Sequence, residues 1–141
     1  MANNTVGRPP KYTSKKKLQK KIDEYFASCE GTYLKDDNGK YVLDKHGNPI
    51  LVGKRPPTTT GLALALGFNS RQSLLNYKEK PEFMDTITRA YARIEQYTEE
   101  RLFDKDGANG AKFSLANNFE GWKDKKSIDA EIGPKLEDLL Q

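Results

Sequence analysis

Polar side chains that could bind nucleic acid follow one glycine, Gly67, in the stretch Ser70-Arg71-Gln72-Ser73 and at Asn76. In the major groove of duplex DNA, arginine can donate two hydrogen bonds to guanine, and glutamine or asparagine can pair in the same way with adenine. Apolar residues before the glycine and polar residues after it are typical of two short helices joined by a sharp turn. The sequence therefore predicts a helix-turn-helix over about residues 58–78, although the same arrangement also occurs in helical domains that bind no nucleic acid.

The distribution of charge supports a polyanionic partner for this motif. Residues 1–80 contain 15 lysines and arginines against 7 aspartates and glutamates, a net charge of +8, whereas residues 81–141 have a net charge of −4. Contacts between basic side chains and phosphates dominate affinity for duplex DNA, and an acidic half is better suited to protein partners. The alternative is that these charges only keep the surface solvated. The side chains predicted to contact DNA are Arg8, Lys11, Lys15, Lys16, Lys20, Lys54, Arg55, Ser70, Arg71, Gln72, Asn76 and Lys78.

The sequence has no arrangement of residues typical of an enzyme or a metal site. It contains one histidine and one cysteine, and it lacks the glycine-rich loop of Walker type that holds phosphates. Cys29 falls on the apolar face of a predicted helix, where a small buried side chain is the usual role. The run Asp36-Asp37-Asn38-Gly39 resembles the start of a calcium loop, but the twelfth position is Gly47 where such a loop needs a glutamate. We therefore predict no catalytic residue, no metal and no cofactor.

The spacing of apolar residues predicts a mainly α fold, with a helix-turn-helix-containing helical domain, a small β-hairpin insertion and a flexible C-terminal tail. We assign residues 1–12 to a flexible basic arm, residues 13–122 to the helical DNA-binding and oligomerisation domain, and residues 123–141 to the tail. The domain has too few apolar residues for a large core of its own, since they make up 35% of the chain against 31% charged residues. Self-association or flexible ends would explain this balance.

Within the domain, the first helix is capped by Thr13 or Ser14 and is followed by the β-hairpin insertion at residues 33–52. Asp36 and Asp44, like Gly39 and Gly47, repeat there at a period of eight residues. The longest predicted helix covers about residues 82–103, and its amphipathic pattern, together with a later short helix, suits an interface between subunits as well as it suits an internal core. The predicted interface residues are Phe83, Ile87, Tyr91, Ile94, Tyr97, Leu102 and Phe113.

Five segments in the same order resemble the small terminase subunits of tailed bacteriophages, a DNA-packaging family. They are Gly7-Arg8-Pro9-Pro10-Lys11-Tyr12, Ile22-Asp23-Glu24-Tyr25-Phe26, Thr60 to Phe68 with Ser70 to Ser73, Arg93-Ile94-Glu95-Gln96-Tyr97, and Gly121-Trp122-Lys123-Asp124-Lys125. The resemblance covers roughly residues 7–126. The tail beyond Ile128 resembles nothing that we can name.

The resemblance implies a non-catalytic protein that assembles into a ring and binds double-stranded viral DNA at the packaging start site. Its other partner would be the large terminase subunit, whose ATPase and nuclease carry out the chemistry. It further implies a location in the host cell cytoplasm and absence from the mature virion. No apolar run approaches the ~20 residues of a membrane span, and the N-terminus lacks the apolar segment of a secretory signal.

Two other functions remain open from the sequence. A helix-turn-helix transcriptional regulator shares every feature as far as residue 80, but it should act as a dimer on a palindromic site. A structural adaptor without DNA affinity would use the positive charge for solubility alone. The state of assembly and the dependence of duplex binding on salt separate these alternatives.

Overall fold

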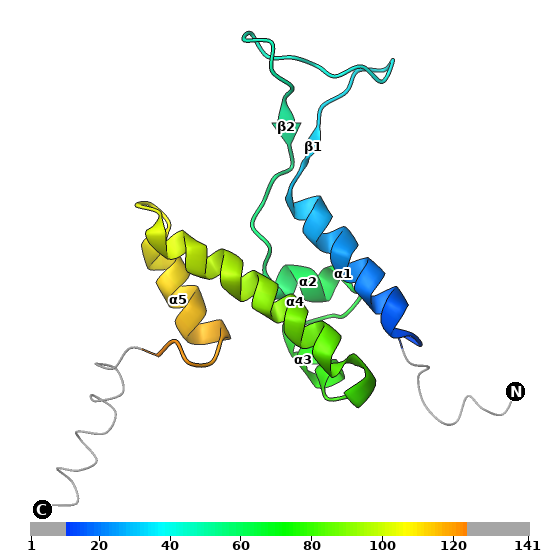
Figure 1. The fold of residues 1–141 in the computed structure, drawn as a ribbon, viewed down its shortest axis with the longest axis vertical. Coiled ribbons are helices and arrows are strands. Elements are labelled where there is room, and N and C mark those ends of the chain that lie inside the picture. Colours follow the sequence, from blue (N-terminus) through cyan, green and yellow to red (C-terminus); the bar gives the residue numbers. More distant parts are fainter. Residues whose placement is uncertain (1–10, 124–141) are drawn as a thin grey trace, which may run out of the picture. The chain divides into compact units, whose positions relative to one another are not determined.

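The computed structural model describes residues 11–123, so Arg8, most of the predicted basic arm and residues 124–141 of the predicted tail lie outside the described residues. The part described is mainly helical with one small antiparallel sheet, which confirms the predicted fold class (Figure 1). Its elements are α1 (Lys15–Cys29), β1 (Thr32–Tyr33), β2 (Leu51–Val52), α2 (Thr59–Ala65), α3 (Arg71–Lys78), α4 (Pro81–Glu100), the 3-10 helix η2 (Arg101–Phe103) and α5 (Ala108–Asn118).

The chain divides into two compact units, Met1–Ala92 and Arg93–Gln141. Helix α4 begins in the first unit and ends in the second, and each unit is described here by itself. The grouping of residues 13–122 into one domain stays a prediction.

Helix α1 begins where the sequence offers a capping side chain. Of the two candidates it is Ser14 that caps, because its Oγ accepts a hydrogen bond of 3.1 Å from the backbone N–H of Lys17. The helix ends before Gly31, whose φ of +84° favours glycine. A Cβ atom at Gly31 would also lie 2.7 Å from the carbonyl oxygen of Val52, so the returning strand can pass close to the helix end only because this residue is glycine.

The core of the first unit lies between α1, α2, α3 and the first half of α4. Apolar side chains at helical spacing on each of these elements are buried, and the largest of them are Leu18, Ile22, Leu62, Leu74, Phe83 and Ile87. The lysines of α1 are all on its exposed side. The amphipathic pattern of the sequence thus separates a packed face from a positively charged one.

The hydroxyl group of Tyr25 fixes the start of α2 against α1. It accepts a hydrogen bond of 2.8 Å from the backbone N–H of Thr58 and lies 3.3 Å from the carbonyl oxygen of the same residue. The side chain of Thr58 in turn caps α2 by accepting from the N–H of Gly61 at 2.9 Å. Burial raises the pKa of Tyr25 above its usual value of 10.0, which extends the pH range over which the hydroxyl keeps its proton.

Residues 32–53 form a β appendage with two lobes beyond a short stem, as Figure 1 shows. In the stem, Thr32 pairs with Val52 and Tyr33 with Leu51. The first lobe is closed by the bridge Lys35–Tyr41 and the second by the bridge Leu43–Pro49. The predicted small β-hairpin insertion is therefore present, in a branched form.

The eight-residue repeat in the sequence corresponds to these two lobes. Asp36 accepts backbone hydrogen bonds from Asn38 and Lys40, and Asp44 accepts the equivalent pair from the residues two and four positions later. Where the lobes meet the stem, three backbone hydrogen bonds close a ring: Leu34 donates to Ile50, Val42 donates to Leu34, and Ile50 donates to Val42. The shape of the appendage is thus set by backbone and aspartate hydrogen bonds.

In the second unit, Ile94 of α4 and Ala111 and Leu115 of α5 are buried. The indole N–H of Trp122 donates a hydrogen bond of 2.7 Å to a carboxylate oxygen of Glu95. Helix α5 begins at Ala108 and contains Gly110 in its first turn, although glycine disfavours the interior of a helix.

Replacing Gly61 by alanine should destabilise the protein although alanine is the better helix former. A Cβ atom there would lie 2.5 Å from the Tyr25 hydroxyl oxygen and 2.8 Å from Thr58 Oγ1, so we expect a loss of roughly 1–3 kcal/mol in the free energy of unfolding. Gly110→Ala is the matched control, because it is also the third residue of its helix and a Cβ there meets nothing within 4 Å. The control should gain about 0.5–1 kcal/mol. Urea unfolding of both variants measures the difference, and a stabilised Gly61→Ala protein would contradict the tight packing described.

Candidate nucleic-acid interface

The turn between α2 and α3 closes helix α2 with two backbone hydrogen bonds. Phe68 N–H donates to the carbonyl of Ala63 at 2.9 Å, and Gly67 N–H donates to that of Leu64 at 3.0 Å. This pair of bonds needs a left-handed residue, and Gly67 supplies it with φ of +91°. Ser70 then caps α3 by accepting from the N–H of Ser73 at 3.1 Å. The short helix, turn and short helix expected from the sequence are therefore present.

Helix α3 buries one side and exposes the other. Leu74 and Tyr77 are buried, while Arg71, Gln72 and Asn76 are exposed. The side-chain amide of Gln72 donates a hydrogen bond of 3.0 Å to that of Asn76, so the two amides are held together on one exposed strip. Arginine and amide groups on a single helix face can reach base edges in a major groove.

Sequence reasoning missed Leu75, which lies on the same exposed strip of α3 with 36% of its surface accessible. It is one helical turn after Arg71, and an apolar side chain in that position can contact the methyl group of thymine. The signal was available, because a leucine next to the buried Leu74 cannot share its face of the helix.

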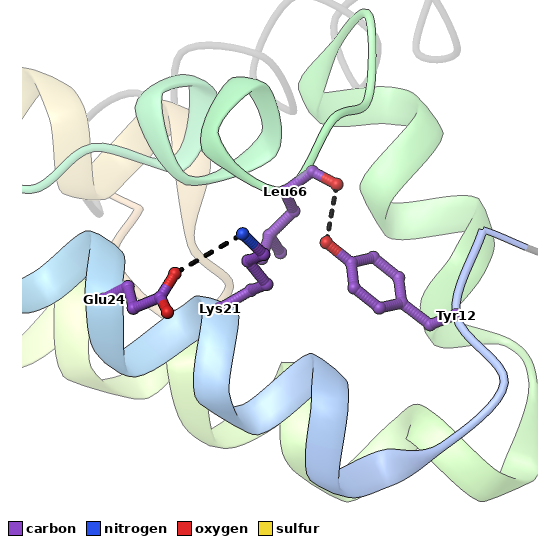
Figure 2. Close-up of polar contacts among 4 residues, drawn as sticks. All are labelled: Tyr12, Lys21, Glu24 and Leu66. Carbon is purple, nitrogen blue, oxygen red and sulfur yellow. Dashed lines mark hydrogen bonds and ion pairs between the residues drawn. The ribbon is translucent and has the colours of Figure 1, made fainter.

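Tyr12 anchors the start of the described chain to the helix-turn-helix region. The Tyr77 hydroxyl accepts from the backbone N–H of Tyr12 at 2.9 Å and donates to its carbonyl oxygen at 3.0 Å. Figure 2 shows the Tyr12 hydroxyl reaching the carbonyl of Leu66, to which it donates at 2.7 Å. Lys11, the residue before Tyr12, is consequently held beside the turn between α2 and α3. Arg8, predicted to contact DNA, lies four positions before Tyr12 and outside the described residues.

Aromatic rings at this anchor also carry two lysines. Lys11 Nζ lies 5.7 Å from the centre of the Phe68 ring, and a Cβ atom on Gly67 would be 3.1 Å from the same ammonium group. Lys80 Nζ lies 4.6 Å from the centre of the Tyr77 ring. The predicted contact residue Lys11 therefore lies directly beside the turn, and Lys80 adds a positive charge at the C-terminal end of α3.

The structure separates the predicted DNA contacts into two groups. The first group surrounds the amino end of α1 and helix α3: Lys11, Lys15, Lys16, Lys20, Ser70, Arg71, Gln72, Asn76 and Lys78. The second group, Lys54 and Arg55, lies at the carboxyl end of α1. There the Arg55 guanidinium donates to the side-chain and backbone oxygens of Ser28 at 2.9 and 3.2 Å, and its backbone N–H donates to the carbonyl of Cys29. Arg55 thus stabilises the end of a helix, where a positive charge is favourable.

The described part of the first unit is positively charged. Its residues 11–92 contain 15 lysines and arginines against 9 aspartates and glutamates, a net charge of +6. On α1, Lys21 and Glu24 form an ion pair of 3.5 Å (Figure 2). Both side chains are more than half exposed, so this pair contributes little to stability. The remaining lysines of α1 leave a surface suited to phosphates.

The residues predicted for a subunit interface differ in exposure. Phe83, Ile87 and Ile94 are buried in the monomer and leave no surface for a second chain, because they form its core. Tyr91, Tyr97 and Leu102 are half-buried, and the Tyr97 ring lies 4.9 Å from the guanidinium carbon of Arg101. Phe113 has 72% of its surface exposed, and Phe103, which the sequence analysis left out, has 87%. Of the predicted interface residues, only Tyr91, Tyr97, Leu102 and Phe113 therefore have side-chain surface that a second subunit could contact.

Within residues 11–123, no three histidine, cysteine, aspartate or glutamate side chains come together in a way that could hold a metal ion. None of the helices in that range is both long enough and apolar enough to cross a membrane.

A family model described as "DNA-packaging protein gp3" matches residues 7–128. The match covers all five segments on which the resemblance to phage packaging proteins was based and ends where that resemblance ends. No curated protein and no solved structure matches the chain.

Alkaline pH should destabilise the first unit through its anchoring tyrosines. Burial raises the pKa of Tyr12, with smaller contributions from Tyr77 and Glu24, and burial also raises the pKa of Tyr25 and Tyr91. Because these pKa values are higher in the folded chain, the stability they confer is complete below pH 10 and is lost as pH rises through the folded values. The free energy of unfolding, measured with urea between pH 8 and pH 11 (about one unit either side of the usual tyrosine pKa), should fall. A Tyr12→Phe, Tyr25→Phe, Tyr91→Phe protein should show a smaller fall, and an equal fall in both proteins would refute the assignment.

Proposed function

We propose that this chain, which belongs to the DNA-packaging protein gp3 family, is a small terminase subunit that binds viral DNA at the packaging start site. The family description gives the chain a role in phage genome packaging. Duplex DNA, the large terminase subunit and further copies of the chain are the partners we propose. The large subunit would supply the ATPase and nuclease, so the chain itself has no catalytic role. It would act in the host cell cytoplasm and be absent from the mature virion.

The observation that carries the DNA-binding proposal is the position of the Tyr12 anchor. It holds Lys11 beside the turn before α3, and Arg71, Gln72 and Asn76 are exposed on one strip of that helix. We propose that α3 enters the major groove and that Arg8 and Lys11 add contacts to phosphates of the same duplex. The lysines at the amino end of α1 would bind phosphates on the same duplex.

Assembly into a ring is supported by the apolar surface that the described chain leaves exposed. Phe103 and Phe113 of the second unit are among its most exposed large apolar side chains. Exposed aromatic side chains are enriched at subunit interfaces and scarce on monomer surfaces. We propose that neighbouring subunits cover these two side chains, and that they also cover the half-buried Tyr91 and Tyr97 of α4 and Leu102 of η2.

Arg71→Ala and Lys16→Ala should affect DNA binding in different ways. If α3 reads bases, Arg71→Ala should cost about 1–3 kcal/mol on the preferred sequence and relax the preference for it. Lys16→Ala should weaken binding to every duplex alike and reduce its salt dependence. Fluorescence anisotropy with a selected duplex and a scrambled duplex, each at several salt concentrations, measures both effects. Equal losses on both duplexes for both variants would remove α3 from the base-reading role.

Light scattering of the purified protein at low and high salt should give a mass well above that of a dimer. Phe113→Glu should lower this mass, because it would bury a charge in the interface, whereas Asn109→Glu should leave it unchanged as an exposed position on the same helix. A clean dimer that binds a palindromic site would instead favour a helix-turn-helix transcriptional regulator. Unchanged assembly of Phe113→Glu would exclude α5 from the interface.

A further inference from the structure

The β appendage, residues 32–53, contains more exposed large apolar side chains than the rest of the described first unit. None of its residues is buried, and the stem and lobes leave six large apolar side chains exposed: Tyr33, Leu34, Tyr41, Leu43, Leu51 and Val52. A two-stranded structure of this size cannot form a core of its own and is normally covered by something else. Its shape nevertheless stays defined, because the turns and the branch point are closed by hydrogen bonds.

One face of the appendage is marked by aromatic contacts. The rings of Tyr33 and Tyr41 lie 6.1 Å apart, and Lys35 Nζ lies 5.0 Å from the centre of the Tyr41 ring, so these three side chains share a face. Side chains alternate between the faces of a strand, which places Leu43 and Leu51 on this same face. We call it the tyrosine face.

The opposite face is also apolar. Alternation along the strands places Leu34, Val42, Ile50 and Val52 there, and we call it the aliphatic face. Leu34 and Val52 are exposed, and the other two are half-buried at the branch point. The appendage is therefore a thin plate with apolar side chains on both faces. A partner that bound one face alone would leave the apolar side chains of the other face exposed.

The charge of the appendage argues against DNA as that partner. Its three lysines are matched by three aspartates, a net charge of zero, whereas the other described residues of the first unit carry 12 positive and 6 negative charges. Each lobe contains both signs, since the first holds Lys35, Lys40 and two aspartates and the second holds Asp44 and Lys45. Copies of such a plate do not repel each other, and lysines of one can approach aspartates of the next.

We propose that the β appendage is a self-association surface, in which the tyrosine face of one copy packs against the aliphatic face of the next. Two different faces in contact make a head-to-tail interface, the type that closes into a ring. The inference deepens the proposed self-assembly and rests on it. It adds an interface in the first unit to the one proposed around Phe113.

Charged side chains on the tyrosine face of the full-length protein test this interface. Leu43→Glu combined with Leu51→Glu should abolish the assembled species in light scattering, while far-UV circular dichroism stays that of the wild type because neither side chain supports the fold. Leu64→Glu is the matched control, since Leu64 is 58% exposed and Leu43 is 53% exposed, and it should assemble like the wild type.

The outcomes separate this inference from the proposed function. If the wild type assembles and the Leu43→Glu, Leu51→Glu protein assembles equally well, the appendage is not the interface and the proposed function stands. If the wild type itself stays a monomer at every concentration and on DNA, both fail. An appendage variant that keeps its assembly but loses duplex affinity would show that the plate contacts DNA, which also overturns the inference.

Cross-linking tests the head-to-tail arrangement directly. In a Cys29→Ala background, which removes the chain's one cysteine, Tyr41→Cys places a thiol on the tyrosine face and Val52→Cys places one on the aliphatic face. With a short bismaleimide, the protein carrying both cysteines should give a ladder of cross-linked chains, and each single-cysteine protein should stay uncross-linked. Dimers from a single-cysteine protein would indicate a like-to-like contact, and no cross-link in any protein would exclude contact; either result overturns the arrangement.

Discussion

The arrangement of the candidate DNA-binding surface depends on the hydroxyl group of Tyr77. By accepting from and donating to the backbone of Tyr12, this one group joins the start of the described chain to helix α3, 65 residues later in the sequence. The ring is buried against Phe83 and the hydroxyl is fully used, so the side chain contributes both apolar packing and two hydrogen bonds. Tyr25 does the same for the start of α2 through Thr58. Two buried tyrosines thus hold together a surface whose outer side chains are largely exposed.

Because buried side chains hold the fold together and the basic side chains lie outside it, a small protein with a modest core can carry a strongly basic surface. Leu18 and Ile22 fill the inner side of α1, while its lysines are on the outer side. Repulsion among them is offset by packing that does not involve them. The β appendage differs, because it has no buried side chain and its form depends on backbone hydrogen bonds and on those accepted by Asp36 and Asp44.

Local patterns in the sequence predicted the elements well, because caps, glycine turns and helical spacing act over a few residues. Ser14 and Gly67 have the roles expected of them. The sequence could not show contacts between residues that are far apart in the chain. Examples are the hydrogen bonds of Arg55 to Ser28 and of Tyr12 to Tyr77. Nor could it show that Phe83 and Ile87 would be buried in the core of the monomer. An amphipathic helix has the same pattern whether a core or a second subunit covers it, so only the fold could distinguish the buried members from Phe113. The roles of individual side chains in DNA binding remain predictions.

Trp122 gives the second unit an optical signal of its own. It is the chain's single tryptophan, and its indole is hydrogen-bonded to Glu95 within that unit, whereas six of the seven tyrosines are in the first. Tryptophan emission excited at a wavelength that tyrosine does not absorb therefore follows the surroundings of one unit alone. Changes in the first unit, such as those that the proposed DNA binding would cause, become visible in that emission only when they alter the surroundings of Trp122. The protein thus carries a native reporter of communication between its two units.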